Sequence, residues 1–158
     1  MNIFSRPSKE IVERILSEAG LPVSDITAEH LDFFFGYGAE REPDGVIAIE
    51  PYGKTALLRS LAVVPLRRNT GVGTSLVTHI EQWARQQGIE SLYLLTTTAE
   101  PFFTHLGYVR TSREEAPLSI QNTKEFSSLC PASSAFMVKQ LQANQPLNRT
   151  RADNARAG

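Results

Sequence analysis

The sequence predicts a single α/β domain in which helices flank a mixed, mostly antiparallel central sheet. Three observations lead to this fold class. The 158 residues are about the length of one domain. After a first predicted helix, strand-like segments follow one another with short connections, as in an antiparallel meander. From residue 71 onward helices and strands alternate, as they do in α/β folds.

The first half of the chain is expected to hold a helix followed by three strands. Apolar residues at helical spacing predict a helix at residues 8–19, with Ser8 as its N-cap and Gly20 just after its end. A turn or a short second helix is expected at residues 24–31. Strands are predicted at residues 32–38, 46–49 and 55–64, with turn sequences at residues 42–45 and 51–53.

The second half is expected to alternate between helices and strands. Gly71 and Gly73 precede a helix predicted at residues 74–87. The apolar run at residues 92–95 predicts a strand, residues 91–97, that is covered on both faces. The remaining predicted elements are a helix at 100–106, a strand at 108–111, a helix within 114–129 and a strand at 135–141.

The folded domain is expected to span residues 1–141. Residues 142–158 are rich in Asn, Gln and Arg and contain one large apolar side chain. Such a segment cannot offset its ordering entropy by burying apolar surface, so it is predicted to be disordered.

Composition excludes several classes of protein. The single cysteine, Cys130, cannot form an internal disulfide or a multi-thiolate metal site, and no metal is expected. No apolar run is long enough to cross a membrane, and the N-terminus lacks the apolar core of a signal peptide, which indicates a cytoplasmic protein without a membrane partner. The formal net charge is −1 without a basic run, which argues against nucleic acid as a partner.

The most informative segment is the glycine-rich turn at residues 65–74, PLRRNTGVGT. Its glycines allow the backbone to pass close to a ligand, and the helix that follows offers free N–H groups and a partial positive charge. Arg67 or Arg68 adds a fixed positive group. Such a turn either surrounds a pyrophosphate or is an ordinary tight turn. It lacks the Gly-Lys-Ser/Thr ending of a P-loop and the three glycines of the dinucleotide fingerprint.

Residues 58–77, LRSLAVVPLRRNTGVGTSLV, resemble the acetyl-CoA-binding core of the GNAT N-acetyltransferases. Residues 102–108, FFTHLGY, resemble the second signature of that superfamily, in which a short helix ends in Leu-Gly-aromatic. The resemblance is strongest over residues 57–109, and residues 8–140 follow the expected order of elements. It implies the GNAT fold and an enzyme that transfers an acetyl group from acetyl-CoA to an amine.

The resemblance also implies which residues bind acetyl-CoA, the expected cosubstrate. Backbone groups of the strand before the turn would pair with the pantetheine arm, and amides of the turn would hold the pyrophosphate. The strand residues are Leu61, Ala62 and Val63, and the turn residues are Arg68, Asn69, Thr70, Gly71, Val72, Gly73 and Thr74. Thr70 stands where the family usually has Arg, Lys or Gln, which should weaken phosphate affinity without abolishing it, because the backbone donors remain.

Phe103 is a second departure from the family pattern. Many members have a tyrosine there that protonates the leaving thiolate of CoA, and phenylalanine cannot do so. General acid–base catalysis contributes about 10²–10⁴-fold. We therefore expect either a solvent-assisted transfer or another proton donor, for which Thr98, Tyr108 and Cys130 are candidates. Phe103 is expected to line the acceptor site or to pack in the core.

The acceptor is expected to be a small amine that carries a carboxylate. Arg59 would form a bidentate clamp for that carboxylate if it faces the cleft, or an ion pair with a nearby glutamate if it does not. Ser60, Thr96 and Thr97 are further candidate acceptor-binding residues. The threonines are also explained by strand propensity alone.

The segments around Arg59 and at residues 94–103 resemble those of GNAT enzymes that acetylate the α-amino group of glutamate. The arsenic-resistance N-acetyltransferase branch is more similar still, and the match includes residues 19–22, 113–117, 125–126 and 128–131. That branch implies acetylation of arsinothricin, an arsenical glutamate analogue, and hence its detoxification. The alternatives are glutamate or another small amine as acceptor, and a non-catalytic acyl-CoA-binding domain. Dimers are common in the superfamily, so a homodimer is an option.

The expected reaction requires a base, because the amine of an amino acid is mostly protonated near pH 7. The neutral amine attacks the thioester carbonyl, and a backbone N–H of the central strand stabilises the oxyanion. Glu50 and Glu125 are the candidate catalytic bases. The alternative is that each is a solvated surface charge.

Overall fold

The computed structural model describes residues 2–129 and 133–141, and in this part of the chain seven strands form one sheet. The strand order is β1-β2-β3-β4-β5-β7-β6. The strands are β1 (Ile3–Ser5), β2 (Phe34–Gly38), β3 (Pro43–Tyr52), β4 (Thr55–Val63), β5 (Ser91–Thr96), β6 (Val109–Arg110) and β7 (Ala135–Gln140). All neighbouring strands are antiparallel except β4 and β5, which are parallel. The predicted mixed, mostly antiparallel sheet is confirmed.

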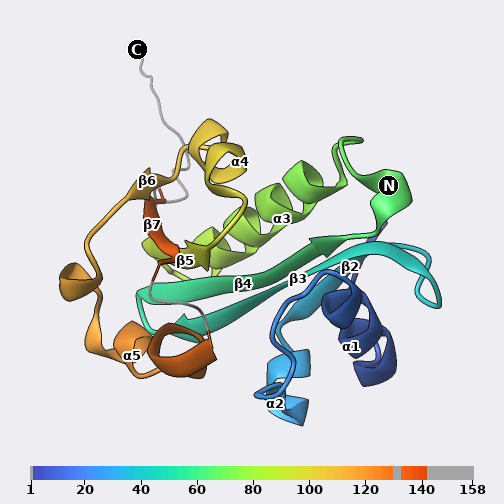
Figure 1. Ribbon diagram of the computed structural model, residues 1–158, viewed down its shortest axis with the longest axis horizontal. Helices are drawn as coiled ribbons and strands as arrows, with labels where there is room; N and C mark the ends of the chain where they lie inside the picture. The colour runs from blue at the N-terminus through green and yellow to red at the C-terminus, as the bar shows by residue number, and fades with distance from the viewer. Residues whose placement is uncertain (1, 130–132, 142–158) are drawn as a thin grey trace.

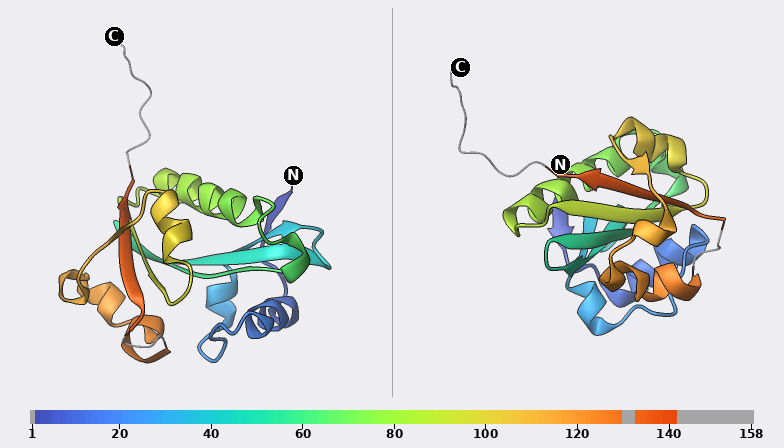
Figure 2. Two further views of the ribbon diagram at one scale, coloured as in Figure 1. Left: turned by 45° about the horizontal axis from the view of Figure 1, so that its top comes forward. Right: turned by 90° about the vertical axis from the view of Figure 1, so that its left-hand side faces the viewer.

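Helices cover both faces of the sheet, as Figure 1 and Figure 2 show. One face carries α3 (Val72–Gln86) and α4 (Glu100–His105). The other carries α1 (Lys9–Glu18), α2 (Ala28–Leu31) and α5 (Leu118–Gln121). Among the described residues, no helix has the length and apolar character needed to span a bilayer.

Each face of the sheet has its own hydrophobic core. On the α3 face the cluster includes Leu76, Ile80, Ile49, Leu58 and Leu94. On the α1 face it includes Val12, Ile15, Leu16, Phe34 and Val46. Burial of one such side chain stabilises the fold by roughly 1.5–3 kcal/mol. Burial on both faces explains why most residues of the central strands β3 and β4 are apolar.

The two long helices begin where local chemistry predicts. Ser8 caps α1 by accepting a hydrogen bond from the N–H of Ile11 at 3.3 Å, and Gly20 follows the helix with a φ of 74°. α3 begins two residues earlier than predicted, at Val72, because Gly71 is itself the N-cap, with a left-handed φ of 94°.

The predicted turns at residues 42–45 and 51–53 are partly wrong, because β3 extends through most of both. The chain reverses instead at residues 39–42, where the N–H of Glu42 donates to the carbonyl of Ala39, and at the turn after Tyr52. Pro43 is the first residue of the strand, a position at which its missing N–H is tolerated. Pairing with β2 and β4 on both sides overrides the turn propensity of this segment.

The single helix predicted within residues 114–129 is also wrong. The structure has three short pieces there: η2 (Arg113–Glu115), α5, and η3 (Glu125–Leu129), one turn of π-helix. Pro117 interrupts the backbone ladder before α5. After α5, the hydroxyl of Thr123 donates to the carbonyl of Ile120 and accepts from the N–H of Phe126, which replaces regular helical bonds.

Two further outcomes concern the ends of the chain. Strand β1 was not predicted, since three residues are too few to show a period and the strand is held by its pairing with β2. The predicted disordered segment, residues 142–158, lies outside the described residues.

Candidate active site

β4 and β5 separate part-way along their length, and a cavity of about 410 Å³ opens between them. Their pairing is confined to residues 55–57 and 91–93, although β4 continues to Val63 and β5 to Thr96. The cavity is lined by residues 20–22 after α1, residues 58–61 of β4, residues 94–99 at the end of β5, Phe103 and Glu125. Beyond residue 57, β4 is not paired with β5 in the described chain, so the sheet ladder between these strands does not use the β4 backbone groups on this side.

A β-bulge changes the course of β4 beside this cavity. The register between β3 and β4 shifts near Ser60, which has a φ of 62°. Left-handed backbone is strained in a residue that has a Cβ, and a bulge turns backbone groups out of the ladder. The change of direction comes immediately before Leu61, the first of the residues expected to bind the pantetheine arm.

The turn between β4 and α3 presents an uncapped helix N-terminus. It consists of η1 (Pro65–Arg67) and residues 68–71. Gly71 provides no side-chain cap, and its carbonyl accepts the N–H of Ser75 at 3.0 Å as the first bond of the helix. The amides of residues 72–74 therefore have no acceptor within the helix and lie at the positive end of its dipole. This geometry suits an anion such as a pyrophosphate.

The side chains of the turn mostly bond to the turn itself. Nε of Arg68 donates to the carbonyl of Val63 at 3.1 Å, and the hydroxyl of Thr70 donates to the carbonyl of Arg67. Asn69 has left-handed backbone with a φ of 64°. Because these side chains are already bonded, the donors that the turn presents to an anion are mainly its backbone N–H groups. The side chain of Thr70 does not occupy these backbone donors.

Arg59 lies at the opposite end of the cavity wall and is surrounded by three carboxylates. Its side chain is 2% exposed. Nη1 donates to Oδ2 of Asp25 at 2.6 Å and to Oε2 of Glu50 at 2.7 Å, and Nη2 donates to Oδ1 of Asp25 at 2.9 Å. Nε donates to Oγ of Ser60 at 3.0 Å and lies 3.2 Å from Oε2 of Glu125. We refer to Asp25, Glu50, Arg59 and Glu125 as the Arg59 cluster.

The three carboxylates of the Arg59 cluster have different surroundings. Burial alone would raise the pKa of Asp25, but its hydrogen bonds and attraction to Arg59 lower it overall. Glu50 also accepts a hydrogen bond from the hydroxyl of Tyr52 at 2.6 Å. Burial raises the pKa of Glu125 to about 7, with repulsion from Glu50 and Asp25 adding to the rise and Arg59 opposing it. Within the described chain, Glu125 is the carboxylate of the cluster that lines the cavity.

Glu50 and Glu125 are therefore not solvated surface charges, because they are 8% and 4% exposed. Arg59 forms the ion pairs with glutamates that were the alternative to a carboxylate clamp. Its partners are Glu50 and Glu125, and the pairs are buried rather than at the surface. Burial opposes the charge of Arg59, but the hydrogen bond to Asp25, the nearby charge of Glu125 and the hydrogen bond to Glu50 hold its pKa above the usual value.

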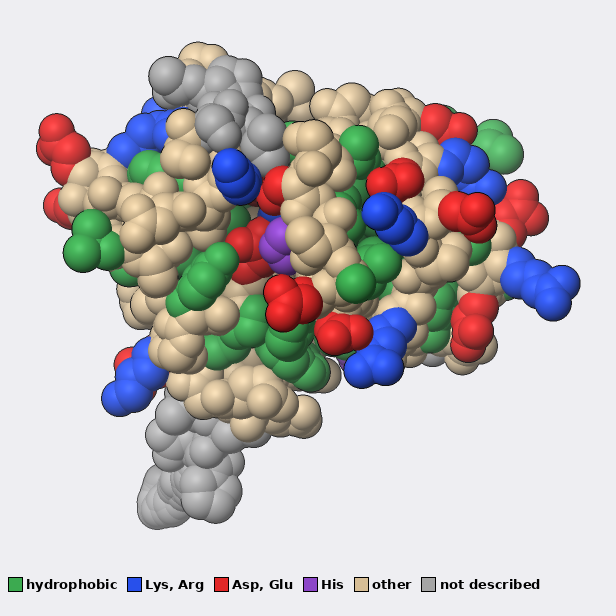
Figure 3. Space-filling model, turned by 90° about the horizontal axis from the view of Figure 1, so that it is seen from below, with side chains coloured by type: hydrophobic (Ala, Val, Ile, Leu, Met, Phe, Trp, Pro, Cys, Tyr) green, Lys and Arg blue, Asp and Glu red, His purple; other side chains and the backbone are tan. Residues whose placement is uncertain are grey.

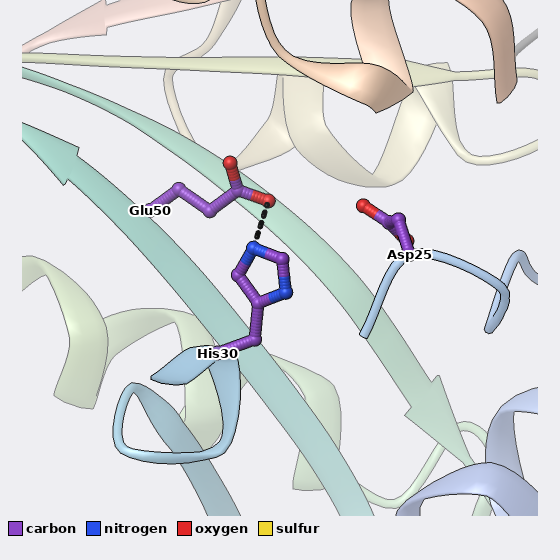
Figure 4. A group of neighbouring side chains, drawn as sticks. All are labelled: Asp25, His30 and Glu50. Carbon is purple, nitrogen blue, oxygen red and sulfur yellow. Dashed lines mark ion pairs between the residues drawn. The ribbon is translucent and has the colours of Figure 1, made fainter. Parts of the chain in front are cut away.

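His30 extends the Arg59 cluster toward the surface, as Figure 4 shows. Figure 3 shows a histidine among acidic side chains on the face that carries α1, α2 and α5. Nε2 of His30 lies 3.7 Å from Oε2 of Glu50, and Nδ1 accepts the N–H of Thr27 at 3.1 Å. Nδ1 is thus engaged at the N-terminus of α2, and Asp25 and Glu50 are already bonded to Arg59. His30, Asp25 and Glu50 offer ligand atoms within 4.8 Å of one another, but they fit an ion-pair network better than a metal site.

The remaining predicted acceptor residues lie at the cavity wall. Thr96 and Thr97 both line it; Oγ1 of Thr96 accepts the N–H of Ala99 at 2.9 Å, and Thr97 is exposed. Phe103 lines the cavity and is also 6% exposed, with its ring packed edge-on against Tyr108. Both interpretations of Phe103, core packing and cavity wall, therefore apply.

Tyr108 cannot act as the proton donor for CoA. Its side chain is fully buried, and its hydroxyl donates to Oε2 of Glu81 at 2.9 Å. Burial and the neighbouring carboxylate of Glu81 raise its pKa. Lys139 binds the same carboxylate at 3.1 Å, so this group ties β7 to α3. Thr98 lines the cavity, and Cys130 lies outside the described residues.

Residues 4–108 match the acetyltransferase (GNAT) family. The chain belongs to that family. It is 35% identical over 82 residues to an amino-acid acetyltransferase of Ralstonia nicotianae, a match that covers 48% of this chain and 18% of that protein. It is 34% identical over 93 residues to an uncharacterised N-acetyltransferase of Chlorobaculum tepidum, which covers 58% of this chain and 59% of that protein.

Solved structures share the GNAT fold. The N-acetylglutamate synthase of Neisseria gonorrhoeae, solved with coenzyme A and N-acetyl-glutamate, matches with a TM-score of 0.74 and 23% identity over 89% of this chain. This chain covers 35% of that structure's chain. The predicted GNAT family and fold are confirmed, and the chain spans only part of the length of these relatives.

Asp25 and His30 were not singled out from the sequence. Asp25 lies in a connection 34 residues from Arg59, and no local pattern marks it. One chemical signal was present: an arginine inside a predicted central strand requires buried acidic partners.

Proposed function

We propose that this chain is an acetyl-CoA-dependent N-acetyltransferase that acetylates the α-amino group of a small amino-acid-like substrate. The cavity between β4 and β5 carries the proposal. In one direction its β4 wall leads through residues 61–63 to the uncapped N-terminus of α3. In the other direction it meets Glu125 of the Arg59 cluster. The proposed pyrophosphate site and a buried carboxylate would thus lie at the two ends of one wall.

The residues present fit acetyl-CoA as the cosubstrate. Amides of residues 72–74 and the turn from Arg68 to Gly71 would hold the pyrophosphate, and the backbone of residues 61–63 would pair with the pantetheine arm. A Cβ on Gly73 would come within 3.3 Å of the ring of Phe102, so the first turn of α3 packs closely against α4. When bound, the cosubstrate supplies a thioester carbonyl to the acceptor amine.

Glu125 is the proposed base. Its carboxylate lines the cavity and titrates near neutrality, so it can accept a proton from the ammonium group of the acceptor. The neutral nitrogen then forms the amide bond as the carbon–sulfur bond breaks. Solvent is the proposed proton source for the leaving thiolate, with Thr98 at the cavity wall as the alternative, because Phe103 has no proton to donate and Tyr108 is bonded to Glu81. Glu50 is less suitable as a base because Arg59 and Tyr52 already donate to it.

The acceptor that we propose is arsinothricin, with glutamate as the alternative. Two of the segments that resemble the arsenic-resistance branch contribute to the cavity, since residues 20–22 and Glu125 line it. Nε of Arg59 would contact the acceptor carboxylate, which would replace Glu125 as the partner of that nitrogen. The hydroxyls of Ser60, Thr96 and Thr97 are the further proposed contacts. The names of the Ralstonia and Neisseria relatives, which refer to amino acids and glutamate, favour the same acceptor class.

A non-catalytic acyl-CoA-binding domain is the second candidate. It is favoured by the absence of a hydroxyl at Phe103 and by the engagement of Tyr108 with Glu81. It predicts acetyl-CoA binding without turnover.

The decisive experiment measures CoA release from acetyl-CoA with arsinothricin, glutamate and a panel of simple amines. We expect the highest kcat/KM on arsinothricin and a loss of about 10²–10⁴-fold in Glu125→Gln. Glu90→Gln is the matched control, because that side chain is 64% exposed and is paired with Lys54. Highest activity on glutamate would favour the alternative acceptor. Binding of acetyl-CoA without turnover on any amine would overturn the enzymatic proposal.

A further inference from the structure

We propose that Asp25 and Glu50 are positioning residues that keep Glu125 able to accept a proton by taking up the charge of Arg59. The inference rests on the proposed role of Glu125 as base. It gives a role to Asp25, which lies in the connection between α1 and α2, and it replaces the alternative role of Glu50 as base.

The bonds of the guanidinium group are unevenly shared. Asp25 and Glu50 occupy its Nη end through three hydrogen bonds of 2.6, 2.7 and 2.9 Å. Glu125 approaches only Nε, at 3.2 Å, and Ser60 accepts from the same nitrogen at 3.0 Å. Asp25 and Glu50 are therefore the principal partners of Arg59, and Glu125 is its most weakly held carboxylate.

The charges of the group lead to the same conclusion. Asp25 and Glu50 place two carboxyl groups on the single guanidinium group of Arg59, so Glu125 is the third acid around one cation. The four side chains are between 2% and 9% exposed, and water screens them little. A carboxylate paired alone with an arginine would be held ionised and would be a poor base. Asp25 and Glu50 also bind Arg59, and they thereby reduce its stabilisation of the ionised form of Glu125.

Other charged groups near Glu125 are placed differently. His30 faces Glu50, and Nε2 of His30 lies 3.7 Å from Oε2 of Glu50. Lys124 precedes Glu125 and is exposed. Arg113 lies over the ring of Phe126, 5.2 Å from its centroid. None of these groups is changed in the variants below, so their effect on Glu125 is the same in every comparison.

The electrostatic part of the proposal can be tested without a substrate. In protein labelled with ¹³C at the glutamate carboxyl groups, NMR titration follows Glu125, whose signal is assigned by its loss in Glu125→Gln. We expect the pKa of Glu125 to fall by about one unit or more in Asp25→Asn, because the freed charge of Arg59 then stabilises its carboxylate. Glu50→Gln is a second variant with the same expected direction. Asp32→Asn is the matched control, because its side chain is 53% exposed and pairs with Arg6.

The catalytic part is tested by the pH dependence of kcat/KM in the same variants. We expect its acidic limb to move to lower pH by the same amount as the NMR titration, and not to move in Asp32→Asn. An unchanged or higher pKa of Glu125 in both Asp25→Asn and Glu50→Gln would overturn the inference. A lower pKa by NMR with an unmoved kcat/KM profile would overturn instead the role of Glu125 as base.

Discussion

Glu125→Gln should change how the stability of the protein depends on pH. Burial raises the pKa of Glu125 from about 4.5 to about 7, so the folded protein binds this proton more tightly than the unfolded chain does. Its contribution to the free energy of unfolding is fully present below pH 4.5. It is lost as pH rises to about 7. Since each pKa unit corresponds to about 1.4 kcal/mol, the loss amounts to about 3 kcal/mol.

Urea unfolding of both proteins at pH 4 and pH 8 measures this effect. Glutamine is nearly isosteric and does not titrate. Between pH 4 and pH 8, the free energy of unfolding of the variant should therefore rise by about 3 kcal/mol relative to that of the parent protein. Titrating groups outside the Arg59 cluster are present in both proteins and cancel in the difference. A difference in stability that stays constant between pH 4 and pH 8 would refute the reasoning, because Glu125 would then titrate alike in the folded and unfolded chain.

Three further substitutions test other parts of the structure. Gly71→Asp should bind acetyl-CoA about tenfold more weakly than Gly71→Asn in calorimetry, because both residues tolerate left-handed backbone but only aspartate repels phosphates; equal affinities would place the pyrophosphate elsewhere. Tyr108→Phe should lower stability in urea by about 1–3 kcal/mol, since buried Glu81 loses a donor; no change would mean that Lys139 satisfies Glu81 by itself. Phe103→Tyr should leave acetyl-CoA affinity intact and raise kcat by placing a hydroxyl at the cavity wall, whereas a large loss of activity would identify Phe103 as part of the acceptor pocket.

Local chemistry allowed much of the fold to be predicted. α1 and α3 have a clear apolar period and glycines at their ends, and β5 is a continuous apolar run. The errors occur where tertiary pairing outweighs local preference. Pro43 and its neighbours are turn-forming residues in isolation, yet two flanking strands hold them in β3.

The candidate site also has one part that could be predicted from local sequence and one part that could not. The turn at Gly71 could be predicted because its glycines and the following helix are contiguous in sequence. The Arg59 cluster could not, because its acids come from a loop, a strand and a π-turn that meet only in the folded protein. Sequence reasoning named Glu50 and Glu125 but gave no means of choosing between base and surface charge, since burial depends on those distant contacts.

The wide separation of the parts of the Arg59 cluster has a consequence for synthesis of the protein. Asp25 lies 34 residues before Arg59, whereas Glu125 belongs to η3, which follows the last helix of the described chain. A nascent chain that has emerged only as far as α4 already contains β4, the turn and α3, and it has the backbone groups that suit a phosphate. It does not yet contain the proposed base. The segment proposed to hold the nucleotide end of the cosubstrate and the carboxylate proposed as the base are therefore synthesised at different stages of translation.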